Sequence, residues 1–190
     1  MEGEIRMNGT KKVYMFLADG FEEIEGLMVV DLMRRAGINI TTVSITADRE
    51  IAGSHGINVM ADSVMADMDF SDAEMIVLPG GMPGTKNLAK CEPLKKILCG
   101  HYNNEGKLAA ICAAPTILSS LGMLKGKKAT CYPSMLSELD CSEALEDSVV
   151  VDGNITTSRG LGTALKFALA LISQLISEEK AAEIAVQVVA

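Results

Sequence analysis

Cys112 is the residue of this chain whose position most clearly favours chemistry. An apolar run over residues 108–111 precedes it, and Ala-Ala-Pro-Thr leads from it into apolar residues at helical spacing. The run is typical of a buried parallel strand, and Pro115 is tolerated only in the first turn of a helix. The spacing predicts a helix that begins at about Ala113, with Cys112 on the bend. This is the geometry of a nucleophile elbow with a thiol in place of a hydroxyl.

A thiol at the start of a helix is a candidate nucleophile because the thiolate is the reactive form. Unpaired N–H groups and the partial positive charge of a helix N-terminus favour an anion, and the same N–H groups can hold an oxyanion. The alternative is that Cys112 is a small buried hydrophobic residue, as many free cysteines are. Spacing alone leaves both interpretations open.

Two other segments leave apolar runs with residues that could assist this thiol. Residues 12–18 lead into a loop that carries Glu22, Glu23 and Glu25, and residues 75–78 lead into Pro-Gly-Gly. Because the carboxyl ends of parallel strands lie at one edge of a sheet, we expect both loops to meet Cys112 there. A protonated glutamate would lower the pKa of the thiol by donating a hydrogen bond to the thiolate, whereas an ionised one would raise it.

Each loop also has an ordinary explanation. One N–H group of Gly80 or Gly81 could pair with that of Ala113 as an oxyanion hole, but Pro-Gly-Gly is also common in tight turns. The glutamates favour a helix N-terminus by their charge alone. We expect Ile24 to face the core, which leaves a neighbouring carboxyl able to reach inward.

The elements that must position these loops alternate along the chain. Asp-Gly-Asn at residues 152–154 lies between two short apolar runs and predicts a hairpin, and residues 47–61 predict a hairpin or a short excursion. Residues 11–190 are therefore expected to form a single domain, a three-layer α/β/α sandwich with a mostly parallel sheet, after a disordered leader at residues 1–10. The predicted strands cover 12–18, 38–45, 75–78 and 108–111, and the predicted helices cover 24–36, 88–102, 113–121, 163–176 and 178–188.

Composition excludes several classes of function. The net charge of −8 and the absence of tryptophan argue against a nucleic-acid-binding face. No apolar run approaches the roughly 18 residues of a membrane span, and the first ten residues lack the apolar region of a signal peptide. The five cysteines and two histidines show no metal-ligand spacing, so we expect no metal. An odd number of cysteines without a disulfide framework favours a cytoplasmic location, and the carbonyl chemistry inferred below requires no cofactor.

Four segments together resemble a known family. Residues 16–25 (FLADGFEEIE), 77–81 (VLPGG), 109–115 (AAICAAP) and 157–163 (TSRGLGT) are similar to motifs of the ThiJ/PfpI superfamily. They are most similar to the branch that contains the Parkinson-disease protein deglycase and its bacterial relatives. The resemblance extends from about residue 11 to the last helix. It implies a flavodoxin-like fold of the class I glutamine amidotransferase-like type, a homodimer, and an elbow cysteine beside a protonated glutamate.

The resemblance also implies roles for individual residues. Cys112 matches the family nucleophile and Glu25 its carboxyl partner, while Gly81 and Ala113 match backbone donors beside the sulfur. The residues that match supporting positions of the site are Gly80, Tyr132, Ser158 and Arg159. Arg35 matches an arginine of the dimer face.

The chain departs from the family pattern in its histidines. The protease and amidotransferase branches have a histidine immediately after the cysteine or elsewhere in a catalytic triad. In this chain Ala113 follows the cysteine. Tyr132, beside Cys131, occupies a place where the deglycase branch often has a histidine. His55 stands where relatives often have an arginine, and its simplest interpretation is a surface turn residue. General-base help must then come from Glu25, from Tyr132 or from water.

These residues predict a cysteine-dependent enzyme that acts on small reactive carbonyls or on glycated amines and thiols, converting methylglyoxal to lactate. The alternative is an oxidative-stress sensor or redox chaperone in which Cys112 becomes a sulfinate. The missing histidine argues against a peptidase or amidotransferase, and the lack of a P-loop argues against thiazole-phosphate chemistry of thiamine biosynthesis. The remaining cysteines are expected to be packing residues: Cys91, Cys99, Cys131 and Cys141.

Overall fold

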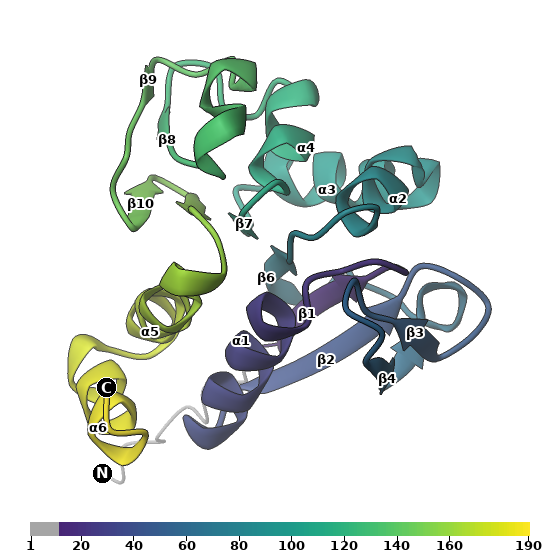
Figure 1. Cartoon of the computed structure of the whole chain (residues 1–190), viewed down its shortest axis with the longest axis horizontal. Coiled ribbons are helices and arrows are strands. Elements are labelled where there is room, and N and C mark those ends of the chain that lie inside the picture. The colour runs from purple at the N-terminus through teal and green to yellow at the C-terminus, as the bar shows by residue number, and fades with distance from the viewer. Residues whose placement is uncertain (1–11) are drawn as a thin grey trace, which may run out of the picture.

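A seven-stranded sheet forms the centre of the molecule (Figure 1). The computed structural model describes residues 12–190, so the predicted leader lies outside the described residues. The strand order is β10-β11-β7-β6-β1-β2-β5, and every neighbouring pair is parallel except β10 and β11. The strands are β1 (Lys12–Leu17), β2 (Asn39–Ser44), β5 (Ser63–Val64), β6 (Ala73–Leu78), β7 (Lys107–Ile111), β10 (Val149–Asp152) and β11 (Ile155–Ser158).

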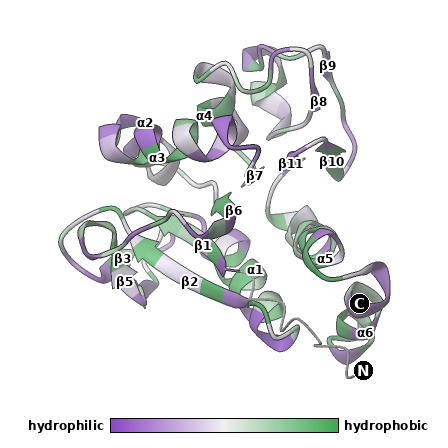
Figure 2. Ribbon diagram, turned by 180° about the vertical axis from the view of Figure 1, so that it is seen from behind, coloured by the Kyte–Doolittle hydropathy of each residue, from purple (hydrophilic) through white to green (hydrophobic). Residues whose placement is uncertain are grey.

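Helices cover both faces of this sheet, which confirms the predicted three-layer α/β/α sandwich. One hydrophobic core joins the sheet to α1 (Glu23–Arg35), α5 (Ala164–Leu175) and α6 (Glu178–Gln187). A second core joins the opposite face to α2 (Gly84–Lys90), α3 (Glu92–Asn103) and α4 (Pro115–Ser120). Figure 2 shows hydrophobic residues along α5, as expected for a helix that is apolar on most of its surface.

Shorter elements complete the fold. The β3 (Glu50–Ala52) and β4 (Asn58–Met60) strands form the antiparallel hairpin that residues 47–61 predicted, and the turn between them contains His55. Among the described residues, no helix is both long enough and apolar enough to cross a membrane. The remaining elements are β8 (Lys128–Ala129), β9 (Glu143–Ala144), η1 (Met65–Asp67), η2 (Pro133–Glu138) and η3 (Leu161–Thr163).

Two predicted helix boundaries were wrong. The single helix expected over residues 88–102 is divided at Cys91, whose backbone is extended, because Pro93 begins a new helix rather than continuing an old one. The helix after Cys112 begins at Pro115 rather than at Ala113. Cys112 itself has a φ of 64°, and a helix can start only after the chain has left that left-handed conformation.

The orientation of α1 also differs from the prediction. Ile24 was expected to face the core, but it is 42% exposed, whereas Glu25 is 1% exposed. The buried face of the helix includes Glu25, Val29 and Leu32. This rotation directs the Glu25 carboxyl inward, toward the carboxyl end of the sheet.

Candidate active site

The loops that sequence reasoning selected meet at one edge of the sheet. Strands β1, β6 and β7 are neighbours, so the segments that follow them start side by side. A fourth strand, β11, pairs with β7 and brings residues 159–161 to the same place. The site is therefore built from four strand ends, and each contributes backbone or side-chain atoms to it.

The backbone of Cys112 is held in an uncommon conformation. A φ of 64° is costly for a residue with a side chain, by about 1–2 kcal/mol, and persists only where the surroundings fix it. The Cys112 N–H donates to the carbonyl of Ser158 at 3.0 Å, and its carbonyl accepts from the N–H of Tyr132 at 2.7 Å. These two bonds hold the elbow between β11 and the segment after α4. Cys112 is partly buried at the base of a cleft.

The sulfur of Cys112 is surrounded by hydrogen-bonding groups. The N–H groups of Gly81 and Ala113 donate to it, and its third hydrogen-bond partner is the side chain of Glu25. Gly81 has a φ of 93°, which a residue with a Cβ rarely adopts. The cleft above the sulfur has a volume of about 280 Å³ and is lined by Gly81, Met82, Cys112, Ala113, Tyr132, Ser134 and Met135.

Glu25 is almost completely enclosed beside this sulfur. Its Oε2 accepts a hydrogen bond from the Gly80 N–H at 2.9 Å, and the Leu161 N–H also donates to the carboxyl. Burial, with a smaller contribution from the Glu22 carboxylate, raises the pKa of Glu25 to about 7, although the hydrogen bonds it receives oppose this. A carboxyl with this pKa exchanges its proton near neutral pH.

The direction of the Cys112 pKa differs from the sequence-based expectation. Burial and the adjacent Glu25 carboxylate raise the pKa of the Cys112 thiol to about 12, and the N–H groups of Gly81 and Ala113 only partly offset this. The helix contributes little because α4 has six residues and begins beyond the elbow. Two neighbouring anions are disfavoured here, so the Cys112–Glu25 pair keeps at least one proton across the neutral range.

Gly80 leaves the space that this pair occupies. A Cβ at Gly80 would lie 2.5 Å from the Cβ of Cys112 and 2.6 Å from Oε2 of Glu25, which is too close for real atoms. A Cβ at Gly160 would make only ordinary contacts, 3.7 Å from Oε1 of Glu25 and 3.9 Å from the cysteine sulfur. Sequence reasoning gave no role to the Leu161 N–H. The signal that could have found it is the TSRGLG segment, in which Gly160 stands two residues after the end of β11.

The remaining predicted site residues either support the site or lie outside it. Ser158 is buried, and its hydroxyl donates to the Ser148 carbonyl at 2.7 Å, so it fixes the β11 end. Arg159 donates to the Glu146 carbonyl at 3.0 Å. Arg35 is not part of the site, because it lies exposed on α1 in an ion pair with Asp31. Cys91, Cys99 and Cys141 pack against the second core. Cys131 is buried.

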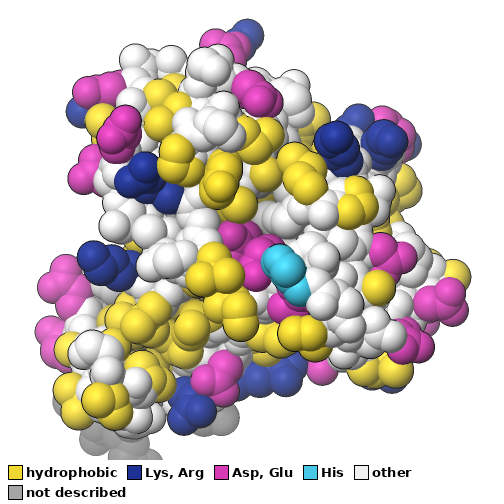
Figure 3. Space-filling model, viewed as in Figure 1, with side chains coloured by type: hydrophobic (Ala, Val, Ile, Leu, Met, Phe, Trp, Pro, Cys, Tyr) yellow, Lys and Arg dark blue, Asp and Glu magenta, His cyan; other side chains and the backbone are white. Residues whose placement is uncertain are grey.

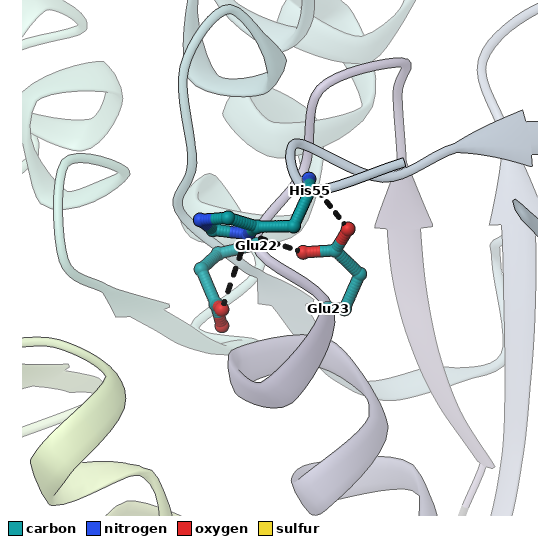
Figure 4. A group of neighbouring side chains, drawn as sticks. All are labelled: Glu22, Glu23 and His55. Atoms are coloured by element: carbon teal, nitrogen blue, oxygen red, sulfur yellow. Dashed lines mark hydrogen bonds and ion pairs between the residues drawn. The ribbon is translucent and has the colours of Figure 1, made fainter. Parts of the chain in front are cut away.

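The first loop also brings together a group that the sequence did not predict (Figure 4). The Oε2 of Glu22 accepts from the Glu25 N–H at 2.7 Å and caps α1. Oxygens of Glu23 accept from the His55 backbone N–H at 2.7 Å and lie 2.9 Å from its Nδ1. Burial acts to raise the pKa of Glu23, but the hydrogen bonds from His55 outweigh it and lower that pKa to about 2.

The close approach at Gly80 generates a testable prediction. In Gly80→Ala the new methyl group must displace the Cys112 side chain or the Glu25 carboxyl, so the rate of thiol alkylation by iodoacetamide at neutral pH should change by at least about tenfold. Gly162→Ala is the matched control, because a Cβ there meets nothing within 4 Å. Mass spectrometry of the Cys112 peptide measures the rate, and equal rates in both variants would contradict the packing described.

Known proteins resemble this chain over most of its length. Residues 11–174 match the DJ-1/PfpI family. The chain is 41% identical over 180 residues to DJ-1 homolog B of Arabidopsis thaliana, covering 93% of this chain and 41% of that protein. It is 29% identical to the glutathione-independent glyoxalase DJR-1.2 of Caenorhabditis elegans, covering 84% and 85% of the two chains.

The solved structures agree with these sequence relatives. Oxidized DJ-1 of Toxoplasma gondii superimposes with a TM-score of 0.91 at 34% identity, covering 94% of this chain and 98% of that one. The chain spans less than half the length of the two Arabidopsis relatives, DJ-1 homologs A and B. The matched length and identity confirm the predicted resemblance, and the chain belongs to the DJ-1/PfpI family.

Proposed function

We propose that this protein is a cysteine-dependent enzyme that converts small 2-oxoaldehydes, such as methylglyoxal, into 2-hydroxy acids such as lactate. One observation carries the proposal. The sulfur of Cys112 lies at the base of an open cleft with two N–H donors and a carboxyl of near-neutral pKa on it. The similarity to a glutathione-independent glyoxalase supports the same reaction class.

The first step uses the single proton that the pair retains. When Glu25 holds this proton, its O–H donates to the Cys112 thiolate, and the thiolate is free to add to the aldehyde carbon of the substrate. The carbonyl oxygen becomes an oxyanion, which takes the proton from Glu25 to form a hemithioacetal. The N–H groups of Gly81 and Ala113 stabilise the negative charge while it develops.

The second step moves hydrogen within the bound substrate. Glu25, now ionised, removes the proton from the carbon that was the aldehyde and returns it to the neighbouring ketone carbon by way of an enediol. The former aldehyde carbon is thereby oxidised to a thioester and the ketone is reduced to an alcohol. Water then hydrolyses the thioester, releasing lactate and the thiol, so the net reaction adds one water to methylglyoxal.

The cleft also bears on the size of the substrate. Its volume of about 280 Å³ and its apolar walls of Met82, Tyr132 and Met135 suit a small uncharged carbonyl compound. An early adduct of methylglyoxal on an amine or thiol would have to place its carbonyl end in this space. Free dicarbonyls and short glycated amines or thiols are therefore the substrate class that we propose.

Substitution of the nucleophile tests the reaction directly. Cys112→Ser should reduce lactate formation from methylglyoxal to the uncatalysed rate, and Glu25→Gln should lower kcat by about 10²–10⁴-fold because it removes the proton carrier. Lactate and residual methylglyoxal are both measured over time. Cys99→Ser, which changes a thiol on α3 away from the cleft, should keep full activity. Lactate formation that persists in Cys112→Ser would exclude the mechanism.

The location of the shared proton predicts an order of thiol pKa values. If Glu25 carries the proton, Glu25→Gln preserves a neutral N–H donor to the sulfur, and Glu25→Ala removes every donor at that position. The thiol pKa should therefore be higher in Glu25→Ala than in Glu25→Gln. The pH dependence of Cys112 alkylation measures this order. A fall of the thiol pKa in both variants would mean that Glu25 is ionised beside a protonated thiol.

A second candidate function rests on the same donors. The N–H groups of Gly81 and Ala113 could equally hold the oxygens of a Cys112 sulfinate, as a sensor of oxidation would require, and a structural relative was solved in an oxidized form. Mild peroxide should then add two oxygens to the Cys112 peptide of the wild type. Absence of that mass shift would exclude the sensor but not the enzyme.

An exposed stripe of α1 supports association of two copies of this chain. Ile24, Met28, Asp31 and Arg35 recur at helical spacing on the outer face of α1, and Figure 3 shows hydrophobic side chains gathered over α1, α5 and α6. Met28 and Arg35 also line a shallow surface pocket with Leu165 of α5. A homodimer through this face would cover these apolar residues.

Reversal of one charge on this stripe tests the homodimer. Arg35→Glu removes the ion pair with Asp31 and places two carboxylates together. The dissociation constant of the dimer should therefore rise at least about tenfold, which corresponds to about 1.4 kcal/mol of association free energy. Sedimentation velocity over a range of concentrations measures the change. Arg34→Glu is the control, because Arg34 pairs with Asp62 rather than with Asp31. A wild-type monomer at every concentration would exclude the homodimer.

A further inference from the structure

The turn that follows β11 is built around the hydroxyl of Thr163. The Oγ1 of Thr163 accepts a hydrogen bond from the Gly160 N–H at 3.1 Å and donates to the Gly160 carbonyl at 2.9 Å. The Thr163 N–H also donates to that carbonyl, at 2.8 Å. The same hydroxyl lies 2.7 Å from that of Ser158, which is bonded to the Ser148 carbonyl. These bonds fix the backbone of residues 160–161 against the end of the sheet.

This turn faces the carboxyl of Glu25, whose two oxygens are held from different sides. Its Oε2 accepts from the Gly80 N–H at 2.9 Å, in the loop after β6. Its Oε1 lies toward the turn, 3.7 Å from the position that a Cβ of Gly160 would take, and the Leu161 N–H donates to the carboxyl. The Leu161 side chain is 52% exposed, so only its backbone belongs to the site.

The titratable groups that act on Glu25 are both acidic. They are the Cys112 thiol at the end of β7 and the Glu22 carboxylate at the start of α1. From the β11 side, the Arg159 guanidinium is bonded to a carbonyl of the segment before β10, and the Tyr132 ring borders the cleft. The groups that donate to the Glu25 carboxyl are the thiol and two backbone N–H groups. An ionised Glu25 therefore depends on those N–H groups for its stability.

We propose that the Thr163 hydroxyl and the Leu161 N–H together position Glu25 for proton transfer, because the hydroxyl fixes the turn and the N–H stabilises the ionised carboxylate. Both act through Glu25 and are positioning groups. The inference rests on the proposed carbonyl reaction for its catalytic consequence, since Glu25 must be protonated in the first step and ionised in the second. A donor to the carboxylate lowers the pKa of Glu25 and opposes the effect of burial. The turn thereby keeps both forms of Glu25 accessible near neutral pH.

Removal of the Leu161 N–H alone tests the inference. Proline has no N–H and is tolerated at the first position of a helix, which Leu161 occupies in η3. The backbone of Gly160 is extended, as the residue before a proline prefers, so Leu161→Pro is expected to fold. It should raise the pKa of Glu25 by about one, which is tenfold in the ratio of the protonated to the ionised form. Leu161→Ala keeps the N–H and is the matched control, in which this pKa should equal that of the wild type.

Carbon-13 NMR of a chain labelled at its glutamate carboxyls measures this pKa, and Glu25→Gln assigns the signal. Because the thiol and the carboxyl titrate as a pair, each variant is also titrated in a Cys112→Ser background. The rise should appear in both backgrounds, so it does not depend on lactate formation. In the lactate assay, the pH of half-maximal rate should move upward in Leu161→Pro, because the ionised base forms at higher pH. A wild type that forms no lactate would exclude the proposed reaction, while the NMR titration still decides whether the turn acts on Glu25.

Thr163 provides a second and milder test. Thr163→Val keeps the shape of the side chain without its hydroxyl, so the pKa of Glu25 should rise by a smaller amount, and Thr163→Ser should restore it. Thr156→Val is the control for loss of one hydrogen bond, because it removes a hydroxyl of β11 that is bonded to Gln174. Thermal unfolding verifies that each variant is folded. An unchanged or lower pKa of Glu25 in folded Leu161→Pro would overturn the inference. If that variant does not fold, equal pKa values in Thr163→Val and Thr163→Ser would overturn it.

Discussion

The arrangement of this site depends on one constraint, which is that two acidic groups share a buried space that can hold only one negative charge near neutral pH. The Cys112 sulfur and the Glu25 carboxyl hydrogen-bond to each other, and each also receives backbone N–H groups. Those donors come from the loops after β6, β7 and β11. The donors make an anion tolerable, while burial makes a second anion costly. A proton that must stay within the pair is available for transfer to a substrate.

The fold maintains this pair through backbone geometry rather than through many side chains. Cys112 adopts a positive φ because Ser158 and Tyr132 hold both sides of its peptide unit. Gly80 has no Cβ, which would lie 2.6 Å from the Glu25 carboxyl and 3.1 Å from the sulfur. The α1 helix turns Glu25 inward and leaves Ile24 at the surface. Each of these features would be a defect in an ordinary core, and together they place the reactive groups.

Three glutamates within four residues have different states because their surroundings differ. Glu22 caps α1 and keeps an oxygen directed at His55. Glu23 is buried but receives hydrogen bonds from His55, which lower its pKa. Glu25 is buried with fewer compensating donors, which raises its pKa. Identical side chains thus acquire structural, charged and proton-carrying character from position alone.

Sequence alone determined the features that depend on local pattern. Apolar runs and glycine or proline boundaries located the main strands, most of the helices, both hairpins and the elbow at Cys112, because these follow from short-range geometry. The same patterns correctly directed three loops to one sheet edge. Only the tertiary structure decided the rest. The direction of the Cys112 pKa, the inward rotation of Glu25 and the meeting of His55 with two glutamates arise from burial and from contacts between distant segments. Such contacts leave no periodic signal in the chain, because burial depends on what the whole fold places around each residue.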